Sequence, residues 1–226
     1  MANRPVYTSL LNNVIFTKTD IEFKYFNGFS IAQKQRSIES LHQEILKNNP
    51  ERKILEISSK SKEPLGVSIS AFNLSLTTRS GKRQSVEVLF QGSKVFEKGG
   101  PYVDIYDLSS REAKKDVRLK NSGNIIGFNL YGKKFPCEPK TLFYNWLYIN
   151  ILNLNKELSE QVLQYDAFTD IEFNPKKSIN CQAEAAAIFV SLSKQGLLSE
   201  ALLSKENFTR IVYGDNGKKV DIDLFE

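Results

Sequence analysis

Two groups of polar residues have the types and the spacing that chemistry requires. Glu87, Gln91 and Lys94 stand at i, i+4 and i+7 in the run that follows Ser85, so a helix would stack them along one face. A carboxylate can transfer protons, and an amine shielded from water can act as a nucleophile. From the residues alone, a surface helix decorated with Glu and Lys is favoured over a stripe that faces a cleft.

The second group is acidic and follows an apolar run. Asp170 and Glu172 alternate in a strand-like segment, so their side chains point to the same side. Pro175 disfavours a helix at Asn174, which indicates that the segment ends in a turn. Functional sites are often assembled from residues at such positions. A capped turn with solvated acids explains the same residues equally well.

Neighbouring elements must position the first group. Ser85 is the expected N-cap of a helix that runs to about residue 97 and buries its apolar face. Before it, residues 67–76 are predicted to form a strand and residues 79–82 a turn. The block therefore predicts a strand, a turn and a capped helix in succession.

The rest of the chain predicts mainly helices. Ser30 and Gln33 have the pattern of a capping box, and apolar residues recur at helical spacing over 31–46. This helix carries His42, the only histidine, which we expect to be solvated because no partner in the sequence singles it out for catalysis. The other predicted elements are strands at 20–26, 54–57 and 125–130, a short basic helix with a capping box at 109–112 that ends at 120, helices at 139–154, 158–165 and 181–195, and strands or an irregular cover at 209–225.

Length and composition indicate one globular domain. The chain has 226 residues, of which 41% are hydrophobic and 25% are charged, and this is enough to bury a core. No repeat or linker-like stretch divides it. We expect an α+β fold, predominantly helical with a small β-sheet, as a single domain over residues 1–226.

Composition also argues against several classes of site. Cys137 and Cys181 lack metal-ligand spacing and only one histidine is present, so we expect free thiols, no metal and no cofactor. The sequence has no signal peptide and no apolar run of membrane-spanning length, so we expect a cytoplasmic protein without membrane contact. The net charge of +5 permits contact with phosphates, although a solvated basic surface is the commoner cause.

Several short motifs keep a fixed order between residues 70 and 172. Residues 70–73 (SAFN), 81–82 (GK) and 85–96 (SVEVLFQGSKVF) follow a pattern in which S-N-F precedes a G-K turn and S-V-E-x-x-F-Q-x-x-K-F. Residues 109–115 and 158–172 add two later anchors. This arrangement resembles the signature of the NADAR family (YbiA-like proteins) over about 66–195, and spaced motifs are hard to match by chance. The resemblance implies a NADAR-like domain with the N-terminal helix and the C-terminal tail as elaborations.

The flanking segments resemble one branch of this family, the antitoxins paired with DarT-type toxins in DarTG systems. One motif departs from the family pattern. Many members have E-x-S-P-x-D-x-x-W-G, whereas Glu172 is followed here by Phe-Asn-Pro without the later Asp and Trp. Because a Trp offers a stacking face, we expect Tyr102, Phe168 or Phe173 to stack on the substrate instead. The resembling flanks are residues 29–35, 56–60, 92–102, 109–116 and 165–182.

The resemblance implies Glu87, Lys94 and Glu172 as catalytic residues. Cleavage between C1 of a ribose and a base nitrogen needs a proton for the leaving nitrogen and negative charge beside the sugar. We assign these tasks to Glu172 and Glu87, with the reverse assignment open. Lys94 is either a nucleophile that forms an imine or a clamp for a phosphate. The other substrate-binding residues are expected to be Phe90, Gln91, Tyr102, Asp170 and Asn180, with Ser109, Ser110 and Arg111 at the pyrophosphate.

The implied function is removal of ADP-ribose from guanine bases in DNA, as the antitoxin of a DarT-type toxin. The partners would then be DNA that carries the guanine adduct, ADP-ribose as product, and the toxin. A basic stripe on the predicted helix could bind a DNA strand, although an ordinary solvated helix face would carry the same run of basic residues. Alternatives are an N-glycosidase for riboflavin-pathway intermediates and a non-catalytic antitoxin that binds the toxin or DNA. The stripe consists of Lys114, Lys115, Arg118 and Lys120.

Overall fold

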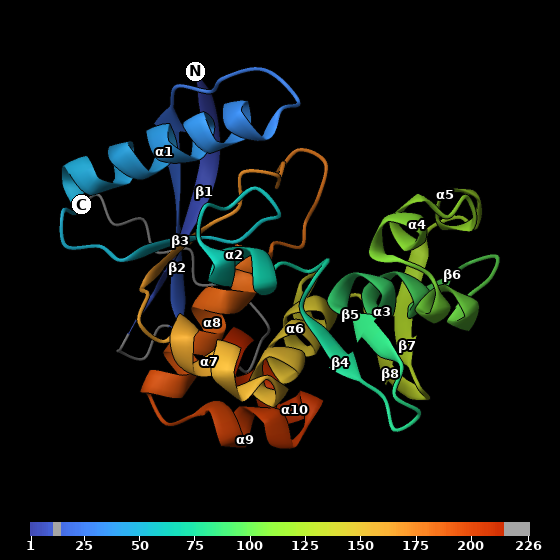
Figure 1. Cartoon of the computed structure of the whole chain (residues 1–226). Helices are drawn as coiled ribbons and strands as arrows, with labels where there is room; N and C mark the ends of the chain where they lie inside the picture. The colour runs from blue at the N-terminus through green and yellow to red at the C-terminus, as the bar shows by residue number, and fades with distance from the viewer. Residues whose placement is uncertain (11–14, 215–226) are drawn as a thin grey trace.

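Figure 1 shows the computed structural model of the chain, which describes residues 1–10 and 15–214. Helices combine with small β-sheets, which confirms the α+β fold that the sequence predicted. One hydrophobic cluster joins residues from Tyr7 to Tyr213. The N-terminal strands and the last described helix therefore share a core.

The N-terminal sheet brings the start of the chain beside a loop from its last third. β1 runs antiparallel to β2 and β9, whereas β3 is parallel to β9. The chain leaves β9 at Thr169, so Asp170 and Glu172 follow a strand end beside a turn, as predicted. The strand order is β2 (Phe16–Phe23), β1 (Ala2–Ser9), β9 (Ala167–Thr169) and β3 (Ile54–Glu56).

Helix α1 (Ile31–Asn48) packs against this sheet (Figure 1). The hydroxyl of Ser30 accepts the backbone N–H of Gln33 and caps the helix. Ile38 and Ile45 share its buried face and belong to a second hydrophobic cluster with residues of β1 and β2. The predicted helix over 31–46 is confirmed.

Two buried helices, α6 (Leu142–Leu154) and α8 (Gln182–Lys194), form the centre of the molecule. Both are apolar around most of their circumference, which is typical of a helix enclosed by other elements. No helix in the described residues is long and apolar enough to cross a membrane. The helices that pack around this pair are α7 (Lys156–Val162), α9 (Leu198–Leu203) and α10 (Lys205–Tyr213).

The middle of the chain forms the right-hand side of Figure 1. A β4–β5 hairpin leads into α3, and a three-stranded sheet of order β6-β7-β8 lies beyond it. Helix α3 contacts the 3-10 helix η1 as well as α4 and α6. The bounds are α2 (Pro64–Ser68), β4 (Ser75–Thr77), β5 (Arg83–Ser85), α3 (Val86–Gly92), β6 (Lys94–Phe96), η1 (Val103–Asp107), α4 (Ser110–Lys115), α5 (Arg118–Asn121), β7 (Ile125–Leu130) and β8 (Lys133–Phe135).

The strand predicted over 67–76 is wrong for most of its length. Pro64 starts the short helix α2, where its missing N–H costs nothing. A tight turn follows, in which Ser70 O accepts the N–H groups of Asn73 and Leu74. Only residues from Ser75 onward pair as β4, because local hydrogen bonds hold the preceding backbone.

Helix α3 ends at Gly92 rather than at about residue 97. The ring of Tyr106 packs against Gly92, and Asn129 donates its N–H to Ser93 O at 2.7 Å. The chain then continues as β6, paired with β7. Contacts with residues far along the chain therefore end the helix.

The C-terminal segment predicted as strands or cover is helical up to residue 213. The hydroxyl of Ser204 accepts the N–H of Asn207 at the start of α10. Phe208 and Tyr213 are buried against the core. Residues 215–225 of the predicted segment lie outside the described residues. The short basic helix predicted to end at 120 is divided into α4 and α5, and the other predicted elements occur with shifted ends.

Candidate active site

A cavity of about 800 Å³ lies between α3 and the loop that follows β9, and we call it the main cavity. Its walls come from residues distant in the sequence, including the turn at 70–72, strand β7, Tyr144 of α6 and the segment 170–182. The predicted site residues that line it are Glu87, Phe90, Gln91, Lys94, Asp170, Glu172 and Asn180.

Helix α3 and the start of β6 supply a chain of hydrogen-bonded polar groups to one wall. Gln91 Nε2 donates to Glu87 Oε1 at 2.9 Å, and Lys94 Nζ donates to Gln91 Oε1 at 2.6 Å. Glu87 and Gln91 are buried, with 7% and 8% of their surfaces exposed. The stripe predicted from the spacing therefore exists, although Lys94 lies beyond the end of the helix and faces the cavity rather than open solvent.

Lys94 lies in apolar surroundings. Its ammonium lies 4.7 Å from the centre of the Phe90 ring. Burial lowers the pKa of Lys94 to about 8; the charge of Glu87 opposes this change and the charge of Lys114 adds to it. A fraction of the amine is therefore neutral at physiological pH, and neutral nitrogen carries the lone pair that a nucleophile needs.

Asp170 anchors the opposite wall. Its Oδ1 accepts the N–H groups of Glu172 and Phe173 at 3.0 and 3.1 Å, and its Oδ2 accepts Nε2 of Gln182 at 3.0 Å. Burial and, to a smaller extent, the charge of Glu56 outweigh the three donors, which lower the pKa of Asp170, so that its pKa is raised to about 8. Asp170 thus fixes the backbone that carries Glu172.

The backbone of Ala71 joins the two walls. Ala71 O accepts the N–H of Glu87 at 2.9 Å, and the Ala71 N–H donates to Oε1 of Gln182 at 2.7 Å. Gln182 also donates to Asp170, so Ala71 and Gln182 together link the start of α3 to the acidic loop. Neighbouring Phe72 has 37% of its surface exposed and lines the cavity.

Lys34 of α1 contacts Glu172, although Lys34 lies outside residues 66–195, the range that resembles the family signature. Its Nζ lies 3.1 Å from Glu172 Oε1 and donates to the hydroxyl of Tyr25 at 2.7 Å. Burial lowers the pKa of Lys34, but the hydrogen bonds with Tyr25 and Glu172 outweigh it, so the pKa is raised. The N-terminal helix therefore contributes to the position of a predicted catalytic carboxylate.

His42 lies behind the acidic loop and does not line the main cavity. Its Nε2 is 2.9 Å from the hydroxyl of Thr169, which donates to Glu56 Oε2 at 2.6 Å. Burial lowers the pKa of His42 to about 4, so the ring is neutral at physiological pH. The expectation of a solvated histidine was wrong, because α1 packs this face against β9.

Four predicted substrate-binding residues do not line the cavity. The hydroxyl of Tyr102 pairs with Ser122, and Ser109 uses its side chain in the capping box with Glu112. Ser110 donates to Phe72 O at 2.9 Å and so supports the cavity wall from behind. Arg111 is exposed.

Of the three rings expected to stack on the substrate, Phe173 lines the cavity, whereas Phe168 is fully buried in the core and Tyr102 lies outside the lining. Other aromatic rings that line the cavity were not predicted. Those of β7 and α6 come from separate elements and have no local signal, whereas Phe72 lies inside the SAFN motif. The lining residues not predicted include Phe72, Phe128, Tyr144, Gln182 and the rim lysines Lys114, Lys140 and Lys177.

A bound metal ion has less support than an organic ligand. In the part of the chain that the structure describes, no group of three His, Cys, Asp or Glu residues is placed to hold a metal ion. Both cysteines are free, Cys181 in the core and Cys137 at the cavity. The lining instead combines the three predicted catalytic side chains, Glu87, Lys94 and Glu172, with further lysines around a space large enough for a nucleotide-sized ligand.

Comparison with known proteins yields a family. A family model described as DarT1-associated NADAR antitoxin matches residues 2–221. The matched range includes all residues that line the main cavity. No curated protein matches the sequence.

Proposed function

The chain belongs to the DarT1-associated NADAR antitoxin family, and from this premise we propose that its main cavity hydrolyses the bond between ADP-ribose and a guanine base in DNA. Such an activity would reverse the modification made by a DarT-type toxin. The products would be ADP-ribose and unmodified guanine in the strand.

One observation carries the proposal. Lys94 and Glu87 line one wall of the cavity and Glu172 lines it from the acidic loop, so one amine and two carboxylates share a space of about 800 Å³. Cleavage of an N-glycosidic bond passes through a state with positive charge on the sugar, and it also requires proton transfer to the leaving nitrogen. The three side chains supply the groups for both tasks.

We assign charge stabilisation to Glu87 and proton transfer to Glu172. Glu87 is buried, and its Oε1 is tied to Gln91, so it is suited to a fixed position beside the sugar. Glu172 has 42% of its side chain exposed and is in contact with solvent, which can supply the proton. The experiment below compares both carboxylates because the reverse assignment uses the same groups.

Lys94 fits the role of nucleophile. Its neutral amine would attack C1 of the ribose, and the electron pair of the breaking C1–N bond would pass to the guanine nitrogen, which takes a proton. Loss of a proton and opening of the sugar ring would give an imine, and water would then release ADP-ribose and restore the amine. The lowered pKa of Lys94, to about 8, supports this step.

The rim lysines fit the pyrophosphate. Lys114, Lys140 and Lys177 line the cavity and are exposed, so their ammonium groups can meet an anion at the mouth. They take the role that the sequence suggested for Ser109, Ser110 and Arg111, which lie outside the lining.

The test is hydrolysis of an oligonucleotide that carries one ADP-ribosyl guanine, with release of ADP-ribose followed by mass spectrometry. We expect the wild-type protein to restore the plain oligonucleotide, and Glu87→Gln, Lys94→Met and Glu172→Gln to lower kcat at least tenfold. Lys194→Ala removes an exposed lysine outside the cavity and the basic stripe and serves as the control. An intact adduct with wild-type protein contradicts the proposal and leaves a binding antitoxin or a small-molecule glycosidase.

A further inference from the structure

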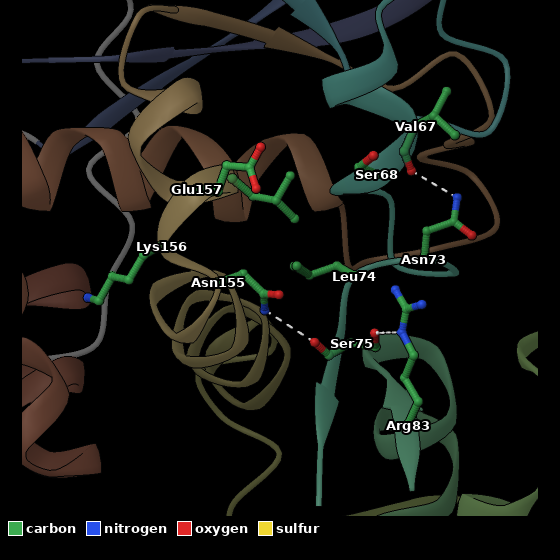
Figure 2. Close-up of a pocket in the computed structure, with 10 residues that line it drawn as sticks. Val67, Ser68, Asn73, Leu74, Ser75, Arg83, Asn155, Lys156 and Glu157 are labelled. Carbon is green, nitrogen blue, oxygen red and sulfur yellow. Dashed lines mark hydrogen bonds between the residues drawn. The ribbon is translucent and has the colours of Figure 1, made fainter. Parts of the chain in front are cut away.

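A second cavity of about 560 Å³ lies between the β4–β5 hairpin and the start of α7 (Figure 2). It shares a wall with the main cavity. Phe72 lines the main cavity, and the next residues along the chain, Asn73 to Ser75, line the second one. Since consecutive Cα atoms lie about 3.8 Å apart, the two cavities are neighbours across this turn.

Arg83 presents a fixed and unpaired guanidinium to the second cavity. Its Nε donates to the hydroxyl of Ser75 at 2.6 Å, which orients the group, and Figure 2 shows its terminal nitrogens pointing toward Asn73. Among the described residues, no carboxylate lies within ion-pair distance of Arg83, whereas Arg118 has two such partners and Arg210 has one. A planar fork held in this way is suited to a phosphate.

The opposite side of the second cavity has a different character. Glu157, at the start of α7, is exposed and lines it, and Figure 2 shows its carboxylate on the side away from Arg83. Leu158, which is half-buried, adds apolar surface, whereas Leu74 is almost fully buried and offers almost none. An anion is therefore favoured on one side and a hydrogen-bond donor on the other, with room for an apolar face between them.

A nucleotide has this distribution of groups. Its phosphate is anionic, its base carries amino or imino donors, and its faces are apolar. A bare pyrophosphate would lack the donor and would meet the charge of Glu157. The volume also lies within the range of about 300–1,000 Å³ that is usual for small-ligand sites.

We propose that the second cavity binds the nucleotide adjoining the modified guanosine in the DNA strand. The phosphodiester lies on Arg83, and the base lies against Leu158 with its donors toward Glu157. This inference rests on the proposed function, because it extends the same substrate past Phe72 into the neighbouring cavity. It makes the protein selective for a polynucleotide over a single ADP-ribosylated nucleotide.

The test compares two substrates, ADP-ribosyl guanosine monophosphate and an oligonucleotide with one ADP-ribosyl guanine. We expect Arg83→Ala to raise the ratio of the oligonucleotide KM to the mononucleotide KM by about fivefold or more, since the phosphodiester loses a charge-assisted hydrogen bond. When the logarithm of the oligonucleotide binding constant is plotted against the logarithm of the salt concentration, the slope for Arg83→Ala should be less steep by about 0.7. This is the change expected for loss of one phosphate contact to a single strand. Arg79→Ala, on the same hairpin turn but outside the cavity, is the control for loss of charge.

The two proposals fail in different ways. If the wild-type protein hydrolyses both substrates and Arg83→Ala leaves the KM ratio unchanged, the second cavity does not hold the strand, although the hydrolase stands. If the wild-type protein hydrolyses neither substrate, the proposed function fails. Fluorescence anisotropy with a labelled unmodified oligonucleotide then decides the inference, because equal affinities of the wild-type and Arg83→Ala proteins would overturn it.

Discussion

The ammonium of Lys34 lies 3.1 Å from the carboxylate of Glu172, and this pair joins the N-terminal helix to the acidic loop of the main cavity. Lys34 is the more buried partner, with 16% of its side chain exposed against 42% for Glu172. An ion pair of this kind contributes little to stability when it is partly exposed. Its effect is expected on the position of Glu172.

The first prediction concerns this pair. Lys34→Met should lower kcat by about threefold to tenfold with little change in KM, because Glu172 loses the ion pair that fixes its position in the cavity. Lys34→Arg should restore most of the activity, since it keeps the cation. The measurement is kcat and KM on the modified oligonucleotide together with Tm. A fall in Tm without a fall in kcat would show that the helix only supports the fold.

A second prediction separates the two roles of Lys94. As a nucleophile its neutral form is active, so kcat/KM should rise with pH and level off above about 8, the pKa to which burial lowers it. As a phosphate clamp its charged form would be active, and kcat/KM would fall through the same pH. Borohydride added during turnover should also trap an ADP-ribose adduct on the wild-type protein and none on Lys94→Arg.

The third prediction concerns stability and pH. The pKa of Asp170 is raised to about 8 by burial and by the charge of Glu56, far above its ordinary value. A carboxyl with a raised folded-state pKa stabilises the fold at low pH, and this contribution is lost as pH rises toward 8. Glu56→Gln keeps an acceptor for the Ile171 N–H but removes the charge that raises the pKa of Asp170. The Tm of this variant should therefore fall less between pH 6 and pH 9 than the Tm of the wild type. Equal falls in Tm, measured by thermal unfolding, would contradict this coupling.

A fourth prediction tests the end of α3. A Cβ at Gly92 would lie 2.5 Å from Cε1 of Tyr106, so Gly92→Ala forces one of them to move. Overpacking of this kind costs about 1–3 kcal/mol, and each kcal/mol lowers Tm by about 2–4 °C in a protein of this size. In the double variant Gly92→Ala/Tyr106→Leu the loss should be smaller than the sum of the two single losses. Strict additivity would mean that the ring does not limit this position.

The sequence predicts those parts of the site that depend on local spacing. Glu87 and Gln91 are four residues apart in a helix with a recognisable cap, so their shared face follows from helical geometry. The same spacing also predicted Lys94 on this face, but the helix ends at Gly92 and Lys94 reaches the cavity from the start of β6. That ending depends on Tyr106 and Asn129, whose approach no local pattern contains.

The parts of the site that were missed come from tertiary contacts. Lys34, Tyr144 and Gln182 lie on three different helices, and only packing around the main cavity brings them together. Similarly, residues 67–76 have an apolar pattern that suits a strand, but their hydrogen bonds are made within a turn. His42 illustrates the same limit, since its partner Thr169 is 127 positions away.

The turn from Val67 to Ser75, with one cavity on each side, has a thermodynamic consequence. If an occupant of the second cavity changes the affinity of the main cavity by some factor, linkage requires that a ligand in the main cavity change the affinity for that occupant by the same factor. If that factor is greater than one, a strand whose modified base is seated is held more firmly at its neighbouring nucleotide. Release of the repaired base then weakens binding in both cavities. Positive cooperativity across this turn would let the protein leave a repaired strand as readily as it captures a damaged one.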